Sequence, residues 1–191
     1  VGNDHVYDIF IVHERSFVNR EVFLDKYNLM QSAYYGDKIP QYIEDLIAGT
    51  RTLATLAEIR AQFLADLEFY GVTEVAAHNA RFDCSALNST MRQLTPLRYF
   101  LPYGIVWWDT LKMARDVILK QPTYRLFCEQ NNLFTKNGRL SATAENLYRY
   151  ITLDPTFVES HTGLEDVQIE REILWYCLRQ HKKMRKKLWE N

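Results

Sequence analysis

The clearest hydrophobic pattern in the chain lies near its carboxyl end. Ile169, Ile173 and Cys177 recur every four residues, which is the spacing of the buried face of an amphipathic helix. Thr162 and Glu165 stand three residues apart just before this pattern, as the two partners of a capping box do. The pattern therefore predicts a helix that begins at Thr162 and buries one face in the core.

Apolar runs and cap signals divide the rest of the chain into strands that alternate with helices. The predicted strands are residues 6–12, 17–24, 72–77 and 104–108, and the predicted helices are 41–48, 55–70, 110–119, 123–132 and 143–151, with another that starts at Asn79. Parallel strands need a helical crossover between them. The order of the elements therefore predicts an α/β sandwich with a mixed central sheet flanked by helices.

Composition limits the setting in which the chain works. Its 191 residues are 47% hydrophobic, which is enough for one well-filled core, so we expect residues 1–191 to form a single domain. Cys84, Cys128 and Cys177 are odd in number and widely spaced, which favours a reducing, cytoplasmic setting over a secreted one. No apolar run approaches the roughly 20 residues of a membrane span, so we expect a soluble protein without a membrane partner. A net charge of -1 excludes no partner by itself.

Two residues at the start of the carboxyl-terminal helix are unusual for their positions. With Thr162 as the cap, His161 precedes it and Asp166 is the fourth helical residue. These two positions normally carry an apolar pair, and here they carry an imidazole and a carboxylate at the positive end of the helix dipole. The pattern predicts a chemical role for the pair, while a surface histidine beside a surface aspartate remains the alternative.

A second carboxylate takes the same position in another predicted helix. If Asn79 caps the helix that follows a strand, Asp83 is again the fourth helical residue. The first turns of such helices point at the crevice at the carboxyl ends of the strands, where open α/β sheets bind ligands. We therefore expect Asp83 and Asp166 to meet there. Asp109 also follows a strand, and for this residue we favour a role as the cap of the next helix.

These residues carry a resemblance to a known family. His-Asn-Ala-Arg-Phe-Asp at residues 78–83 resembles the second exonuclease motif of the DnaQ-like, or DEDDh, 3'-5' exonucleases, and His161 with Asp166 resembles their third motif. Residues 109–115 are similar to the segment found between those motifs. The likeness covers roughly residues 60–178, and two motifs in the right order and separation make it specific. Within the family, the chain is similar to bacteriophage members.

The resemblance implies an RNase H-like three-layer sandwich and the removal of nucleotides from the 3' end of single-stranded nucleic acid. We favour DNA as the substrate, with RNA as the alternative, because that choice depends on how a 2'-hydroxyl is accommodated. Two divalent ions, Mg²⁺ or Mn²⁺, would provide the nucleophile and stabilise the leaving oxygen, and magnesium prefers oxygen ligands such as carboxylates. By the match to the family, Asp83 and Asp166 are metal ligands and His161 is the general base. Asn79 matches a motif position and is assigned to nucleic-acid binding besides its role as a cap.

One part of the family pattern is missing from this chain. The family takes two further metal ligands from an Asp-x-Glu on its first strand, whereas this sequence has only Asp66-Leu67-Glu68, within a predicted helix. Residues two apart on a helix face different sides and cannot share a metal. We therefore expect the first strand, with its Asp-x-Glu, to precede Val1. The alternatives are a non-catalytic module that binds nucleic-acid ends and an unrelated α/β domain.

Basic residues gather near the carboxyl terminus without an intervening acid: Arg179, Lys182, Lys183, Arg185, Lys186 and Lys187. The negative end of a helix dipole favours cations, so a solvated helix end explains them, and so does phosphate binding. Lys182, Lys183, Arg185 and Lys186 are therefore candidate contacts to nucleic acid. The oligomeric state stays open.

Overall fold

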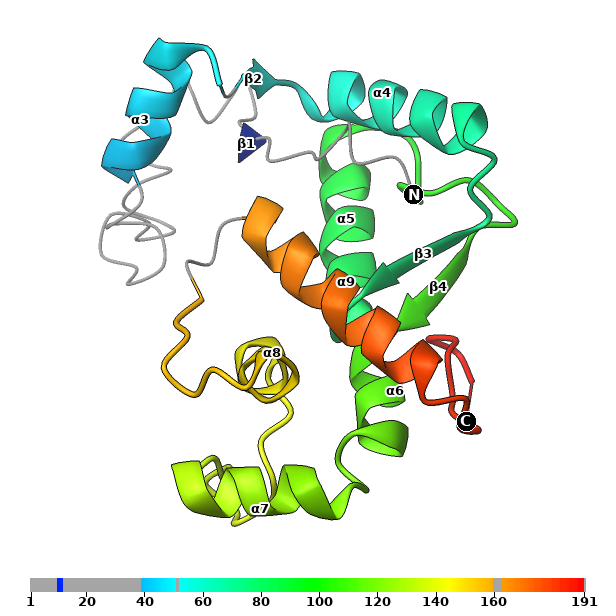
Figure 1. The fold of residues 1–191 in the computed structure, drawn as a ribbon. Helices are drawn as coiled ribbons and strands as arrows, with labels where there is room; N and C mark the ends of the chain where they lie inside the picture. Colours follow the sequence, from blue (N-terminus) through cyan, green and yellow to red (C-terminus); the bar gives the residue numbers. More distant parts are fainter. Residues whose placement is uncertain (1–9, 12–38, 51, 160–162, 191) are drawn as a thin grey trace. The chain divides into compact units, whose positions relative to one another are not determined.

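The chain folds into two compact units (Figure 1). The computed structural model describes residues 10–11, 39–50, 52–159 and 163–190. Residues 1–71 and 90–100 make up the first unit, and residues 72–89 and 101–191 make up the second. In the described part of the chain, no helix is long and apolar enough to cross a membrane.

In its described residues, the first unit contains a pair of short strands, two complete helices and the end of α5 (Ala80–Leu94), from Thr90 to Leu94. Its described elements other than α5 are β1 (Phe10–Ile11), α3 (Ile39–Ala48), β2 (Leu53–Ala54) and α4 (Leu56–Phe69). β1 and β2 pair in parallel. The Thr55 hydroxyl accepts a hydrogen bond from the Glu58 amide at 3.3 Å, and the Glu58 carboxylate accepts one from the Thr55 amide at 2.7 Å. This is the capping box that the sequence predicts at the start of α4, and the strand predicted at 17–24 lies outside the described residues.

The second unit is built around a parallel strand pair joined by a helix. Its elements are β3 (Glu74–Ala77), α5 (Ala80–Leu94) as far as Ser89, β4 (Val106–Asp109), α6 (Thr110–Val117), α7 (Pro122–Asn131), α8 (Ala144–Thr152) and α9 (Gly163–Arg179). β3 and β4 are parallel, with Ala77 opposite Asp109, and α5 is the crossover between them. The first turns of α5 and α6 therefore start side by side.

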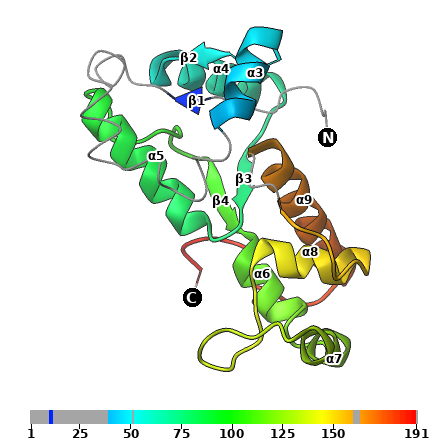
Figure 2. The ribbon, with the colours of Figure 1, turned by 90° about the vertical axis from the view of Figure 1, so that its left-hand side faces the viewer.

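The main core of the second unit lies among its helices. α9 packs against α6 and α8 (Figures 1 and 2), and the predicted stripe of Ile169, Ile173 and Cys177 is completely or almost completely buried. The core residues that it meets are Met113, Ala114, Val117, Ile118, Tyr124, Cys128 and Leu147. This confirms the amphipathic pattern from which the helix was predicted. α9 begins at Gly163, directly after the predicted cap Thr162, which is outside the described residues.

The α/β class is confirmed, and the described chain is mostly helical. Its strands form two separate parallel pairs. The carboxyl-terminal segment adds an antiparallel neighbour to β4, because the Asp109 amide donates to the Lys186 carbonyl and the Leu188 amide donates to the Trp107 carbonyl, both at 2.8 Å. The described residues thus contain both strand directions, without the larger mixed sheet that the sequence predicts.

Candidate functional site at the strand ends

Asp109 fixes the junction between the two strand ends. It is buried, with 4% of the residue exposed. Its Oδ1 accepts hydrogen bonds from the Leu111 and Lys112 amides at 3.0 and 3.4 Å. The same oxygen accepts from the Asn79 amide at 3.2 Å. Asp109 is therefore the cap of α6, as predicted, and it also holds the turn that leads into α5.

Asn79 stands at the start of α5, as expected, in an unusual conformation. The helix begins at Ala80, yet Asn79 has φ 66, in the left-handed region that asparagine tolerates better than most residues. Capping residues normally have an extended backbone. Asn79 is exposed, and its backbone amide, engaged by Asp109, orients the turn. Asp83 lies in the first turn of α5, as predicted.

His78 is a partly buried residue directly after β3. Its Nε2 lies 2.8 Å from the Ala142 carbonyl oxygen, and its Nδ1 lies 3.0 Å from the Thr110 hydroxyl. A carbonyl only accepts hydrogen bonds, so Nε2 carries the proton and Nδ1 accepts from the hydroxyl. The pKa of His78 lies below its ordinary value, and burial is the main cause. The imidazole is therefore neutral near pH 7 and joins β3 to α6 and the segment before α8.

Two carboxylates of α9 belong to the same site. Asp166 lies in its first turn, and Glu170 follows four residues later, on the same face of the helix. The backbone N–H of His78 donates a hydrogen bond to the Glu170 carboxylate. This bond links α9 to the residue that follows β3.

Burial and nearby negative charge raise the pKa of two acidic side chains at this junction, Glu170 and Asp83. Burial, as the largest cause, and then the charges of Asp83, Asp166 and Asp109 together raise the pKa of Glu170 to about 7. The pKa of Asp83 is raised, chiefly by burial and then by the charge of Asp109. These acids from α5, β4 and α9 thus share one region of negative potential. We call them the acidic cluster: Asp83, Asp109, Asp166 and Glu170.

Glu159 extends the acidic cluster toward α8. Burial, as the largest cause, then a hydrogen bond with Asp166 and the charge of that carboxylate together raise the pKa of Glu159 to about 7. Two carboxyl groups form such a bond when one of them carries a proton. At neutral pH the cluster therefore holds protons that isolated carboxylates would have lost.

The described carboxylates do not complete a metal site. Within residues 10–11, 39–50, 52–159 and 163–190, no group of three or more His, Cys, Asp or Glu side chains is placed to hold a metal ion. Asp66 and Glu68 lie in α4, so the one Asp-x-Glu of the sequence is helical, as predicted. His161 lies outside the described residues.

The basic carboxyl-terminal residues follow α9, which ends at Arg179, and do not extend it. Arg185 donates to the Asp116 carboxylate from its backbone amide at 3.0 Å, from Nε at 2.9 Å and from Nη2 at 3.0 Å. The Lys186 ammonium lies 5.1 Å from the centre of the Trp108 ring. Lys182 and Lys183 are exposed. Of the four candidate contacts, these two lysines have their charges most open to solvent.

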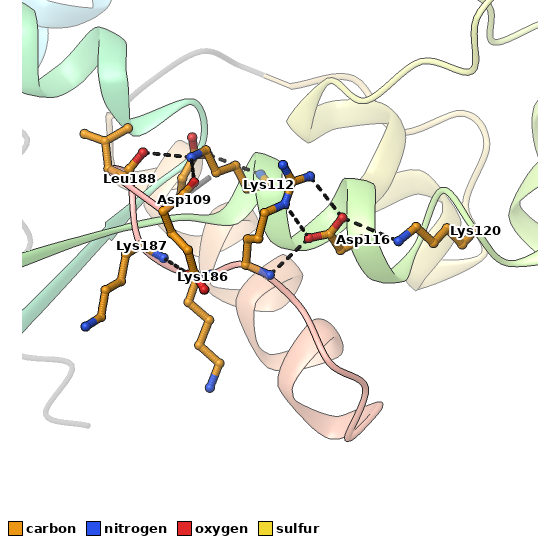
Figure 3. Close-up of polar contacts among 9 residues, drawn as sticks. Asp109, Lys112, Asp116, Lys120, Lys186, Lys187 and Leu188 are labelled. Carbon is orange, nitrogen blue, oxygen red and sulfur yellow. Dashed lines mark hydrogen bonds and ion pairs between the residues drawn. The ribbon is translucent and has the colours of Figure 1, made fainter.

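The same carboxyl-terminal segment is held to α6 by a further cation. Lys112 Nζ donates to the backbone carbonyl of Leu188 at 2.8 Å and to that of Glu190 at 2.6 Å (Figure 3). Together with the Asp116 contacts, these bonds give the basic segment a structural role beside β4 and α6.

Glu170 is the site residue that the motifs did not identify. The available signal was its spacing, because a residue four positions after Asp166 lies on the same face of a helix.

Comparison with protein-family models, curated proteins and solved structures finds no match for this chain.

Proposed function

We propose that this chain belongs to a DnaQ-like DEDDh 3'-5' exonuclease with an RNase H-like fold, which shortens single-stranded nucleic acid, DNA in preference to RNA, from its 3' end. The observation that carries the proposal is the shared environment of Asp83 and Asp166. The two motif residues lie in the first turns of α5 and α9, and both of their charges raise the pKa of Glu170. Two motifs distant in the sequence thus act on one buried carboxyl group.

The acidic cluster fits divalent cations by the chemistry of its donors. Its oxygens are of the kind that Mg²⁺ and Mn²⁺ prefer, and the repulsion between its carboxylates is what a bound cation would relieve. The described residues alone are not a complete ligand set. In the proposal, Asp83 and Asp166 hold metal, and bound metal would supply an activated water and stabilise the leaving oxygen.

The other residues position these groups or move protons. His161 takes a proton from the attacking water as general base, the role that its place in the third motif implies. Asp109 holds the turn before α5 through the Asn79 amide, and so fixes where Asp83 projects. The His78 amide donates to the Glu170 carboxylate, and so links α9 to the end of β3.

The test is an assay of the natural protein, including any residues that precede Val1, on a 5'-labelled single-stranded oligonucleotide with Mg²⁺ or Mn²⁺. We expect mononucleotide release that stops when EDTA is added. Asp83→Asn and Asp166→Asn should each lower the rate by at least about 100-fold, because losing a ligand should cost no less than losing one of its outer-shell partners, which costs about 10- to 100-fold. Asp154→Asn is the matched control, because Asp154 is exposed and its carboxylate accepts hydrogen bonds from the amide and hydroxyl of Thr156.

A second readout is Mn²⁺ binding measured by calorimetry, which needs no turnover. Asp83→Asn and Asp166→Asn should weaken Mn²⁺ binding, whereas Asp154→Asn should not. Absence of metal-dependent hydrolysis, with binding of single strands retained, would contradict the enzyme and favour the non-catalytic module that binds nucleic-acid ends. Absence of both hydrolysis and single-strand binding would contradict both functions.

A further inference from the structure

A large cavity lies in the second unit, apart from the carboxylates of the acidic cluster. Its volume is about 1150 Å³, and it is lined by α6, α7 and the hairpin-like segment 133–143 that precedes α8. Within this segment the Thr135 amide donates to the Arg139 carbonyl at 2.8 Å, and the Ser141 amide donates to the Leu133 carbonyl at 3.0 Å. These bonds give the wall of the cavity a defined backbone.

The cavity is lined by more positive than negative charge. Arg115 of α6, Arg125 of α7 and Arg139 of the hairpin-like segment line it, against one carboxylate, that of Glu129. All three arginines are exposed. In the part of the chain that the structure describes, no hydrogen bond or ion pair engages their guanidinium groups. Three elements therefore present unneutralised donors, suited to phosphate oxygens, to one concave surface.

Size and lining distinguish the kind of ligand that this cavity fits. Pockets for small molecules typically measure about 300 to 1,000 Å³, and this cavity is larger. Phe134 lines it with 41% of the residue exposed, and exposed aromatic rings in basic grooves are platforms on which bases stack. Separated guanidinium groups around an aromatic ring favour a stretch of a polynucleotide over a single nucleotide.

His78 links this cavity to the acidic cluster. Its side chain lines the cavity, while its backbone N–H donates to the Glu170 carboxylate. One residue thus borders both features. The acidic cluster repels phosphates, so a strand whose end lies there needs cationic contacts further along its backbone.

We propose that the cavity binds the phosphate backbone of single-stranded nucleic acid, with Arg115, Arg125 and Arg139 as its phosphate contacts and Phe134 as a stacking surface. This inference rests on the proposed function for the class of ligand. In this proposal, the cavity binds the part of the nucleic-acid strand that lies away from the 3' end being cut.

The test measures binding alone, in EDTA, by the fluorescence anisotropy of a labelled oligothymidylate of about 12 nucleotides, within the range of known single-strand sites. Arg125→Ala combined with Arg139→Ala should weaken binding about 10-fold. It should also flatten the dependence of log Kd on log salt by about 1.4, since each phosphate contact on a single strand contributes about 0.7. Glu129→Gln should tighten binding by about 2-fold, because it removes a repelling charge.

Arg98→Ala is the control, because Arg98 is an exposed arginine that does not line the cavity, and it should leave both affinity and salt dependence within error. Thymidine monophosphate and inorganic phosphate, as competitors, should displace the oligonucleotide only at far higher concentration. Equal affinities for the double variant and the control, no binding by the wild-type protein, or competition by the mononucleotide at equal concentration would each overturn the proposal. Circular dichroism checks that the variants fold.

The binding experiment and the cleavage experiment can fail separately. Loss of affinity in the double variant would support the cavity even if no hydrolysis were found. Hydrolysis by the wild-type protein, with unchanged binding by the double variant, would support the enzyme and remove the cavity from its substrate site.

Discussion

Glu170→Gln should stabilise the metal-free protein at alkaline pH and leave its stability at acid pH nearly unchanged. The folded protein raises the pKa of this carboxyl from 4.5 to about 7. Below pH 4.5 the group is protonated in both the folded and the unfolded chain, so it costs no stability. As the pH rises toward 7, the unfolded chain loses this proton first and the free energy of unfolding falls. Above pH 7 the loss is complete.

The magnitude follows from the size of that increase. A pKa raised from 4.5 to about 7 corresponds to roughly 3 kcal/mol, and partial exposure of the side chain reduces this to about 2 kcal/mol. Glutamine keeps an oxygen that can accept the His78 N–H, so the substitution removes the charge and not the hydrogen bond. The advantage of the variant should therefore grow from near zero at pH 4.5 to about 2 kcal/mol at pH 8.

Urea unfolding in EDTA, followed by tryptophan fluorescence from pH 4.5 to pH 8, measures this difference. Glu172→Gln is the matched control on the same helix, because its side chain is 35% exposed and ion-paired with Arg171. The control should show no gain in stability at pH 8. If Glu170→Gln were less stable than the wild-type protein at pH 8, or its advantage were the same at every pH, the account of a buried and repelled carboxylate would be refuted.

Three further predictions concern other parts of the chain. His161→Ala should lower single-turnover cleavage at saturating Mg²⁺ by about 100-fold, the usual contribution of a general base, and cleavage within threefold of wild type would remove His161 from the mechanism. Asp116→Asn should lower the free energy of unfolding by about 1 kcal/mol, because it weakens the pair with Arg185. The hydrogen bonds from Arg185 hold the pKa of Asp116 well below its ordinary value. The difference in stability between variant and wild type should therefore be full above pH 4 and shrink as the pH falls below 4. Replacing Lys182 and Lys183 by alanine should flatten the salt dependence of single-strand binding if they contact phosphates, and an unchanged slope would leave them as solvated cations.

Much of the local structure could be predicted from the sequence, because its causes lie within a few residues. The capping box of Thr55 and Glu58 forms across a single turn. Asp109 caps α6 through amides two and three residues ahead. The buried stripe of α9 follows from a period that any amphipathic helix shares. The positions of Asp83 and Asp166 in first turns follow from the same local rules.

The tertiary structure alone decided which of these side chains act on one another. Glu170 becomes part of the site because the His78 amide, far away in the sequence, donates to it. Its pKa reflects burial first, and the charge of Asp166 within α9 is joined by charges from α5 and β4 that no pattern within α9 contains. Arg185 is similar, because its basic neighbours suggested free cations, whereas folding placed it against Asp116. Sequence spacing determined which residues stand at the start of each helix. The pairing of β3 with β4 and the packing of α9 determined which charges share an environment, because electrostatic energies depend on distance in space and on burial.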